Sequence, residues 1–173
     1  MKFSFSWLKD YLETDLSADE VGDVLTDTGL EVESLTDPRK RLGQLSVGEI
    51  LKVEKHPNAD KLKVGDVDSG TGILKIVCGA PNVKNGMKVV VAKPGDFIPG
   101  LNINLKASKI RDVKSEGMMC SEKELEISDE HDGIIELPSE TEVGTLFSEL
   151  LGDEKIIFEI AITPNRPDAL GIY

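Results

Sequence analysis

The stretch LSVGEILKVEKHPNADKLKVGDVDSG, residues 45–70, contains two β-rich runs on either side of the motif HPNADKL. Pro57 biases His56 towards extended backbone, as at the end of a strand. Asn58 and Asp60 are residue types that favour turns and caps. A catalytic His–Asp pair needs a nucleophile or a metal, and no serine or cysteine lies at a recognisable nucleophile elbow. The motif therefore predicts a loop or a single helical turn that joins two strands, and not a reaction centre.

Similar runs continue along the chain between glycine and proline turns. They are GILKIVCGAPN, MKVVVAKPGDF, INLKASKI and GIIELP. About five or six short strands at this spacing predict a small barrel or sandwich rather than a parallel sheet. They suit a five-stranded oligonucleotide-binding barrel, the OB-fold. We therefore expect a β-rich α+β protein with an OB-fold domain over residues 43–150.

The N-terminal segment has a different pattern. It predicts a strand over Met1–Phe5, a short helix capped by Ser6, a helix from the capping box SADE at Ser17–Glu20 to Gly29, and the extended run LEVESL at 30–35. The basic stretch PRKR that follows is expected to be a linker. At the other end, TEVGTLFSELLG predicts a helix closed by Gly152, and KIIFEIAI predicts a strand.

Residues 1–40 and 153–173 are each too short to hold a hydrophobic core alone. Both are amphipathic, and the expected barrel lies between them. We therefore predict one discontinuous α/β domain, 1–40 plus 153–173, with the OB-fold barrel inserted into it. The chain ends on the apolar run DALGIY, from which we expect the second segment to continue past Tyr173.

Charge is unevenly distributed along the 173 residues, whose net charge is −12. Residues 44–125 hold 13 basic and 10 acidic residues, a net of +3, whereas residues 1–43 carry −5 and residues 126–173 carry −10. A weakly basic centre between acidic ends is compatible with a phosphate-bearing partner for the centre alone. No apolar run approaches the roughly 20 residues of a membrane span.

Two cysteines, Cys78 and Cys120, lie far apart without a CxxC motif. They predict free thiols in a cytosolic protein without a structural zinc site. Phosphate-binding GxxxxGK[ST], GxGxxG, HExxH and GxSxG motifs are all missing from the sequence. The residues alone thus point to a binding module, with no catalytic and no metal-ligating residues to assign.

Two motifs carry a resemblance. HPNADKL after the first expected strand and SEGM after the last resemble the tRNA-binding OB module appended to several aminoacyl-tRNA synthetases. The phrases VCGAPNV, KPGDFIPG, SEGMMCSEKEL and EIAITPNRPDALGIY resemble the N-terminal region of bacterial phenylalanyl-tRNA synthetase beta subunits, and this similarity extends over the whole chain. The resemblance also implies the discontinuous domain, because in that family the N-terminal residues pair with a segment after the OB module.

The resemblance implies three tRNA-binding residues, Lys61, Ser115 and Met118. Lys61 would supply phosphate charge, Ser115 a short hydroxyl contact and Met118 an apolar platform for a base. The family attaches phenylalanine to its tRNA in the cytoplasm as an α2β2 tetramer, using ATP and magnesium. Its aminoacylation site lies in the alpha subunit, and its editing pocket and magnesium ligands lie further along beta, so this chain should be non-catalytic and hold no cofactor.

Two features keep alternatives open. Lys93-Pro94 stands where stand-alone tRNA-binding modules have Asn-Leu, and Phe97 is the one aromatic residue in 44–125. Base stacking, and hence affinity, should therefore be low. A free-standing OB-fold tRNA chaperone and a protein–protein scaffold are the alternative functions, and the sequence leaves open whether the module contacts tRNA or serves assembly.

Overall fold

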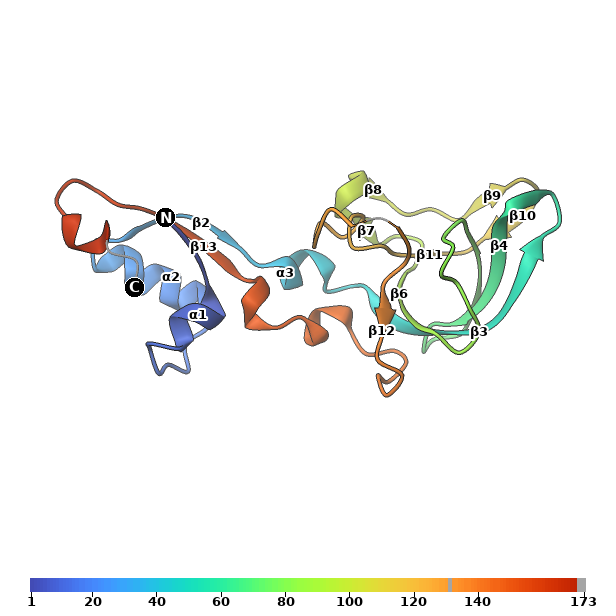
Figure 1. Ribbon diagram of the computed structural model, residues 1–173, viewed down its shortest axis with the longest axis horizontal. Coiled ribbons are helices and arrows are strands. Elements are labelled where there is room, and N and C mark those ends of the chain that lie inside the picture. Colours follow the sequence, from blue (N-terminus) through green and yellow to red (C-terminus); the bar gives the residue numbers. More distant parts are fainter. Residues whose placement is uncertain (131, 171–173) are drawn as a thin grey trace. The chain divides into compact units, whose positions relative to one another are not determined.

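The structure, a computed structural model, describes residues 1–130 and 132–170, so the expected C-terminal end at 171–173 lies outside the described residues. The chain divides into two compact units (Figure 1). The terminal unit comprises Met1–Pro38 together with the described residues from Leu151 onward, and the central unit comprises Arg39–Leu150. The chain is rich in β-strands and has few helices.

The terminal unit is a three-stranded antiparallel sheet with two helices. Its elements are β1 (Lys2–Ser4), α1 (Phe5–Lys9), α2 (Ala18–Asp27), β2 (Glu31–Thr36), two short 3₁₀ turns, η3 (Asp153–Lys155) and η4 (Pro167–Leu170), and β13 (Ile157–Ala161). β13 lies between β1 and β2, with Phe158 opposite Phe3 on one side and Leu35 on the other. Segments from both ends of the chain thus build one sheet.

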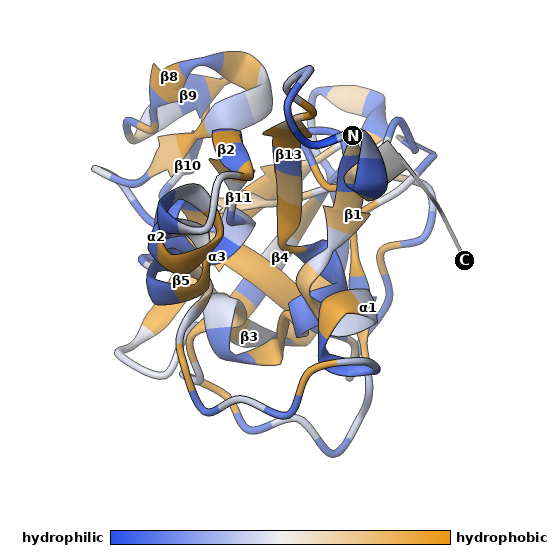
Figure 2. Cartoon of the chain, turned by 90° about the vertical axis from the view of Figure 1, so that its left-hand side faces the viewer, coloured by the Kyte–Doolittle hydropathy of each residue, from blue (hydrophilic) through white to orange (hydrophobic). Residues whose placement is uncertain are grey.

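An aromatic cluster forms the core of this unit. Phe158 is fully buried, and its ring centre lies 5.4 Å from that of Phe3 and 6.0 Å from that of Phe5. Figure 2 shows hydrophobic and hydrophilic residues alternating around α2, whose Val21 joins the same core. Ile157 is only half-buried, because neighbouring residues of a strand point to opposite faces.

The helix ends correct one expectation and confirm two. The first strand stops at Ser4, whose Oγ accepts a hydrogen bond from Trp7 N, so Ser4 and not Ser6 caps α1. The capping box is present, because Ser17 Oγ accepts from Glu20 N and the Glu20 carboxylate accepts from Ser17 N. Gly29 follows α2 with φ +89°, the conformation expected of a helix C-terminal glycine.

The central unit is an antiparallel β-structure. Its elements are α3 (Pro38–Leu42), β3 (Ser46–His56), β4 (Ala59–Asp68), β5 (Ile73–Cys78), β6 (Lys88–Ala92), β7 (Phe97–Ile98), η1 (Pro99–Leu101), β8 (Ile103–Asn104), β9 (Ser108–Ile110), β10 (Val113–Ser115), β11 (Met118–Met119), β12 (Glu136–Leu137) and η2 (Phe147–Leu150). The main sheet has the order β11-β6-β3-β4-β5, and β12 also pairs with β6.

β5, the edge strand of the main sheet, is hydrogen-bonded to the segment that leads into β11. Glu116 N donates to Lys75 O at 2.8 Å, and Val77 N donates to Ser115 Oγ at 3.1 Å. β11 pairs with β6 at the opposite edge of the sheet, so the segment from β10 to β11 contacts both edges.

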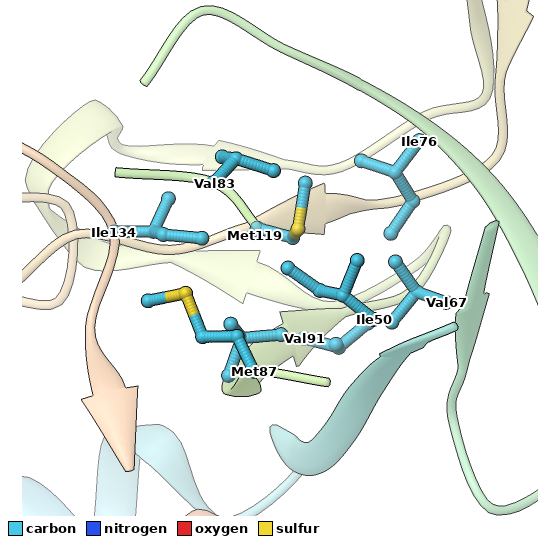
Figure 3. Packing of buried hydrophobic residues seen from close by; sticks show 9 residues of the cluster. Ile50, Val67, Ile76, Val83, Met87, Val91, Met119 and Ile134 are labelled. Atoms are coloured by element: carbon cyan, nitrogen blue, oxygen red, sulfur yellow. The ribbon is translucent and has the colours of Figure 1, made fainter. Parts of the chain in front are cut away.

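The core of the central unit is built from Ile, Val and Met side chains (Figure 3). Its buried members are Ile50, Val67, Ile76, Val83, Met87, Val89, Val91, Met119 and Ile134. β6 reads KVVVA, and its last four residues are buried on both faces of the strand. This composition agrees with the scarcity of aromatic residues in the sequence.

One expectation about the connections is wrong, and another holds in part. Residues 141–152 form no α-helix: Gly144 has φ +89°, and the segment bonds to the start of β3 through Val47 N to Thr145 O and Phe147 N to Leu45 O, both within 2.9 Å. These bonds to β3 use the backbone groups that a helix would need. The basic stretch PRKR contains the boundary between the two units, as expected of a linker, but it is helical: it forms α3, whose last residue, Leu42, is fully buried.

Candidate nucleic-acid interface

Lys61 lies in β4 with an exposed side chain. His56 pairs with Ala59 across a two-residue turn, whereas Lys55 pairs with Lys63. The residues between Ala59 and Lys63 are therefore extra on the β4 side and form a bulge that includes Lys61. The motif joins two strands, as expected, but the turn is shorter than the expected loop or helical turn, because β3 and β4 extend through most of the motif and leave only Pro57 and Asn58 between them.

Ser115 ends β10 and is buried. Its Oγ accepts from Val77 N and donates to Gly117 O, each at 3.1 Å. The hydroxyl hydrogen is therefore engaged within the protein, and the side chain stabilises the contact with β5. A direct contact of Ser115 with RNA stays a prediction.

Met118 begins β11, pairs with Ala92 and is half-buried. It lines a pocket of about 250 Å³ together with Ser115, Ile110, Cys78 and others. Lys61 is not among the residues that line this pocket. The structure thus brings two of the three predicted residues together beside an apolar hollow, and Lys61 lies apart in the β3–β4 hairpin.

Gly117, between these residues, has a steric role. A Cβ at this position would lie 2.9 Å from Ala92 O and 3.1 Å from Ile76 Cδ1. Both distances are shorter than a normal contact, and a backbone oxygen cannot move away as a flexible side chain can. A glycine is needed where the chain passes from β10 to β11 this close to β6.

Basic side chains that the sequence analysis missed lie at the ends of two hairpins. They are Lys55, beside the β3–β4 turn, and Lys109 and Arg111, at the β9–β10 turn. The signal was present in SKIRDVKS, where two short runs flank the dipeptide Arg-Asp. The expected single run INLKASKI is divided between β8 and β9, and β9 forms a second hairpin with β10 that the expectation lacks.

The thiol of Cys78 in the pocket is uncharged at neutral pH. Burial raises its pKa, and the same cause raises the pKa of the Cys120 thiol. Both cysteines are free, as expected. A raised pKa gives little thiolate, so neither side chain is suited to nucleophilic chemistry.

Residues 1–130 and 132–170 contain neither a metal-ligand cluster nor a membrane-spanning helix. No group of three or more His, Cys, Asp or Glu side chains there is placed to hold a metal ion. No helix in the same ranges is long and apolar enough to cross a membrane.

Comparison with known proteins gives relatives for nearly the whole chain. It is 53% identical over 177 residues to the phenylalanine–tRNA ligase beta subunit of Ruegeria pomeroyi, covering 99% of this chain and 22% of that protein. It is 51% identical over 173 residues to the same subunit of Brucella abortus, covering 99% and 21%. The chain spans about a fifth of the length of these relatives. The similarity confirms the resemblance to phenylalanyl-tRNA synthetase beta subunits that the motifs indicated.

One solved structure resembles part of the chain, and a family model matches its centre. The MetRS-related protein from Pyrococcus horikoshii is 28% identical with a TM-score of 0.42, covering 58% of this chain and 85% of that chain. The family model described as "Putative tRNA binding domain" matches residues 45–146. That range covers more than half of the chain and includes β3 to β12. The chain belongs to the tRNA-binding-domain family that this model describes.

Proposed function

We propose that the chain is the tRNA-binding and assembly region of a phenylalanine–tRNA ligase beta subunit. The observation that carries this proposal is the 53% identity to such a subunit over 99% of the chain. The complete enzyme would attach phenylalanine to its tRNA in the cytoplasm, using ATP and magnesium, as an α2β2 tetramer. This chain would contribute binding, and the reacting groups would lie in other parts of that enzyme.

The central unit would be an OB-fold barrel inserted into a discontinuous terminal domain. The sheet order β11-β6-β3-β4-β5, together with the bonds from Ser115 and Glu116 to β5, supports a five-stranded closed barrel. The pairing of β13 with both β1 and β2 supports a terminal domain made from the two ends of the chain.

RNA would bind the central unit beside the pocket. The Lys61 ammonium is exposed and would contact a phosphate, and the half-buried Met118 would offer an apolar surface to a base. Ser115 would act mainly by fixing the wall of the pocket, since its hydroxyl hydrogen is donated to Gly117 O.

Ultraviolet crosslinking of the chain to 4-thiouridine-containing phenylalanine tRNA tests this assignment. Mass spectrometry should map the crosslinks to peptides of β4, β9, β10 and β11. Crosslinks confined to α1 and α2 would contradict an RNA-binding central unit. A second tRNA serves as the control for selectivity, which we expect to be small because base stacking is limited.

A role in assembly has its own support in the terminal unit. Trp7 and Tyr11 are 38% and 69% exposed, and their ring centres lie 5.1 Å apart. Trp7 also contacts Phe3, at 5.8 Å, beside an open apolar hollow of about 330 Å³ lined in part by Met1. Exposed aromatic residues are enriched in protein interfaces. In the complete beta subunit, Trp7→Ala with Tyr11→Ala should reduce co-purification of the alpha subunit, and unchanged recovery would contradict this role.

A further inference from the structure

Two hairpins of the central unit end against each other. The β3–β4 hairpin turns at Pro57-Asn58, and the β9–β10 hairpin turns at Arg111-Asp112. Arg111 and Asp112 have positive φ angles of 47° and 73°. Positive φ at both turn residues is typical of a tight type I′ hairpin. Asn58 Nδ2 donates to Arg111 O at 3.3 Å, and Arg111 Nη1 donates to Asn58 O at 3.4 Å.

His56 makes the buried part of this contact. Its side chain is 4% exposed, and Asn58 N donates to its Nδ1 at 3.0 Å. Because an amide N–H can only donate, Nδ1 is unprotonated, and Nε2 carries the hydrogen of a neutral ring. Nε2 lies 3.0 Å from Ile110 O, to which it donates. Both ring nitrogens are thus engaged, one within its own turn and the other across to the second hairpin.

The two hairpin ends carry unneutralised positive charge. Lys55 and Lys61 lie in the first and Lys109 and Arg111 in the second, and all four side chains are exposed. Within residues 1–130 and 132–170 none of the four forms an ion pair, although Asp60 and Asp112 lie nearby in the sequence. Some other bases of this unit are paired, namely Lys52 with Glu54, Lys88 with Glu49 and Lys114 with Glu116, whereas others, such as Lys75 and Lys106, form no ion pair within the described residues. Four bases without an ion pair therefore lie together where the two hairpins meet.

We propose that the two hairpin ends form one phosphodiester-binding patch, and that His56 is the positioning residue that holds them together. The ligand would be the RNA backbone, so the inference rests on the proposed tRNA-binding function and specifies its site. Each hairpin end alone offers two of these four basic side chains. Fixing the second hairpin against the first would present all four to one stretch of backbone without a further ordering step.

Two substitutions separate the two bonds of the imidazole ring. In His56→Gln the side-chain amide nitrogen reaches the place of Nε2 and can still donate to Ile110 O. In His56→Asn the amide oxygen takes the place of Nδ1 and can still accept from Asn58 N, but the bond across the hairpins is lost. Both variants keep a polar side chain of similar size, so a general loss of folding should affect them alike.

The readouts are hydrogen exchange without RNA and the salt dependence of tRNA binding. His56→Asn should speed exchange of the β9–β10 amides and make the log–log salt slope shallower by about one to two units, the contribution of two phosphate contacts. His56→Gln should stay near wild type in both. The double variant Lys109→Ala with Arg111→Ala should show the same slope as His56→Asn, and combining all three changes should add little. Lys52→Ala, which removes a paired base, serves as the charge control.

The outcomes distinguish this patch from the broader proposal. A wild-type slope in both His56→Asn and the Lys109/Arg111 double variant would overturn the patch and leave tRNA binding intact. An equal loss in His56→Asn and His56→Gln would also overturn it, because the bond across the hairpins would then not matter. Absence of tRNA binding by the wild-type chain would instead overturn the proposed function, and the patch with it.

Discussion

The two units of this chain bury their cores by different means. The central unit packs aliphatic side chains and methionines from β3 to β6, β11 and the segments that connect the strands. The terminal unit has three short strands from distant parts of the chain, and its core centres on the rings of Phe3, Phe5 and Phe158. A core that depends on a few large residues and on pairing between chain ends should be the less stable one, and its amides should exchange first.

Removal of the Phe158 ring from the centre of the terminal core should lower the free energy of unfolding more than the other substitutions below. Phe158→Ala leaves a cavity between Phe3 and Phe5, which costs about 3–5 kcal/mol for a buried phenylalanine. Exchange of amides in α2 and β2 should approach the rate of an unfolded chain, while β3 to β6 keep their protection. Equal loss of protection in both units would show that they unfold as one, contrary to the comparison.

A glycine of the central unit provides the matching test there. Gly117→Ala places a Cβ 2.9 Å from Ala92 O, and overpacking of this kind costs about 1–3 kcal/mol. Urea unfolding followed by hydrogen exchange should show the loss in the central unit and not in the terminal unit. Gly65→Ala is the control, because its nearest neighbours would lie 3.7 Å away, an ordinary contact. Equal effects of the two substitutions would refute the steric argument.

A smaller, pH-dependent effect is expected in the terminal unit. Arg166 Nη1 donates to Thr28 O at the end of α2, and its guanidinium holds the pKa of Asp168 below the usual range. A carboxyl group with a lowered folded-state pKa stabilises the fold above its unfolded pKa, about 3.9, and this contribution is lost as the pH falls through the folded value. Because Asp168 is exposed, the effect should be slight.

The stability of the terminal unit in Asp168→Asn should therefore differ from wild type at pH 7, and the difference should shrink as the pH falls from about 4 to about 2. A difference that persisted unchanged over this range would contradict the assignment to the carboxylate. Arg166→Gln should lose the same pH-dependent part and keep a further difference at low pH, because it also removes the hydrogen bond to Thr28 O.

Much of the fold could be predicted because the signals were local. The Ser17 capping box and the terminal glycine of α2 are read from adjacent residues, and the buried run KVVVA has the pattern of a strand. The helix predicted over 141–152, which does not form, shows the limit of such local signals. Its apolar spacing fits a helix, but Gly144 and backbone hydrogen bonds to β3 override that preference, and such bonds are not visible in local sequence. Tertiary contacts override the local helix propensity of this segment.

The candidate site was predictable in part for the same reason. The motifs carrying Lys61, Ser115 and Met118 were recognised, but their geometry was not. Ser115 was expected to present its hydroxyl to RNA, and the structure engages that hydroxyl hydrogen with Gly117 O. The contact of His56 with Ile110 joins residues 54 positions apart, so no local pattern could indicate it.

The most direct test of the account is the affinity of the chain for tRNA measured at several salt concentrations, for wild type and Lys61→Ala. Binding should be weak, with a Kd of roughly 10⁻⁴–10⁻⁶ M at physiological salt, and similar for phenylalanine tRNA and a second tRNA. The log–log slope should be about −2 to −3, and Lys61→Ala should make it shallower by about one unit for both tRNAs. Nanomolar binding selective for phenylalanine tRNA, or no binding by a folded chain, would contradict an electrostatic RNA-binding role for the central unit.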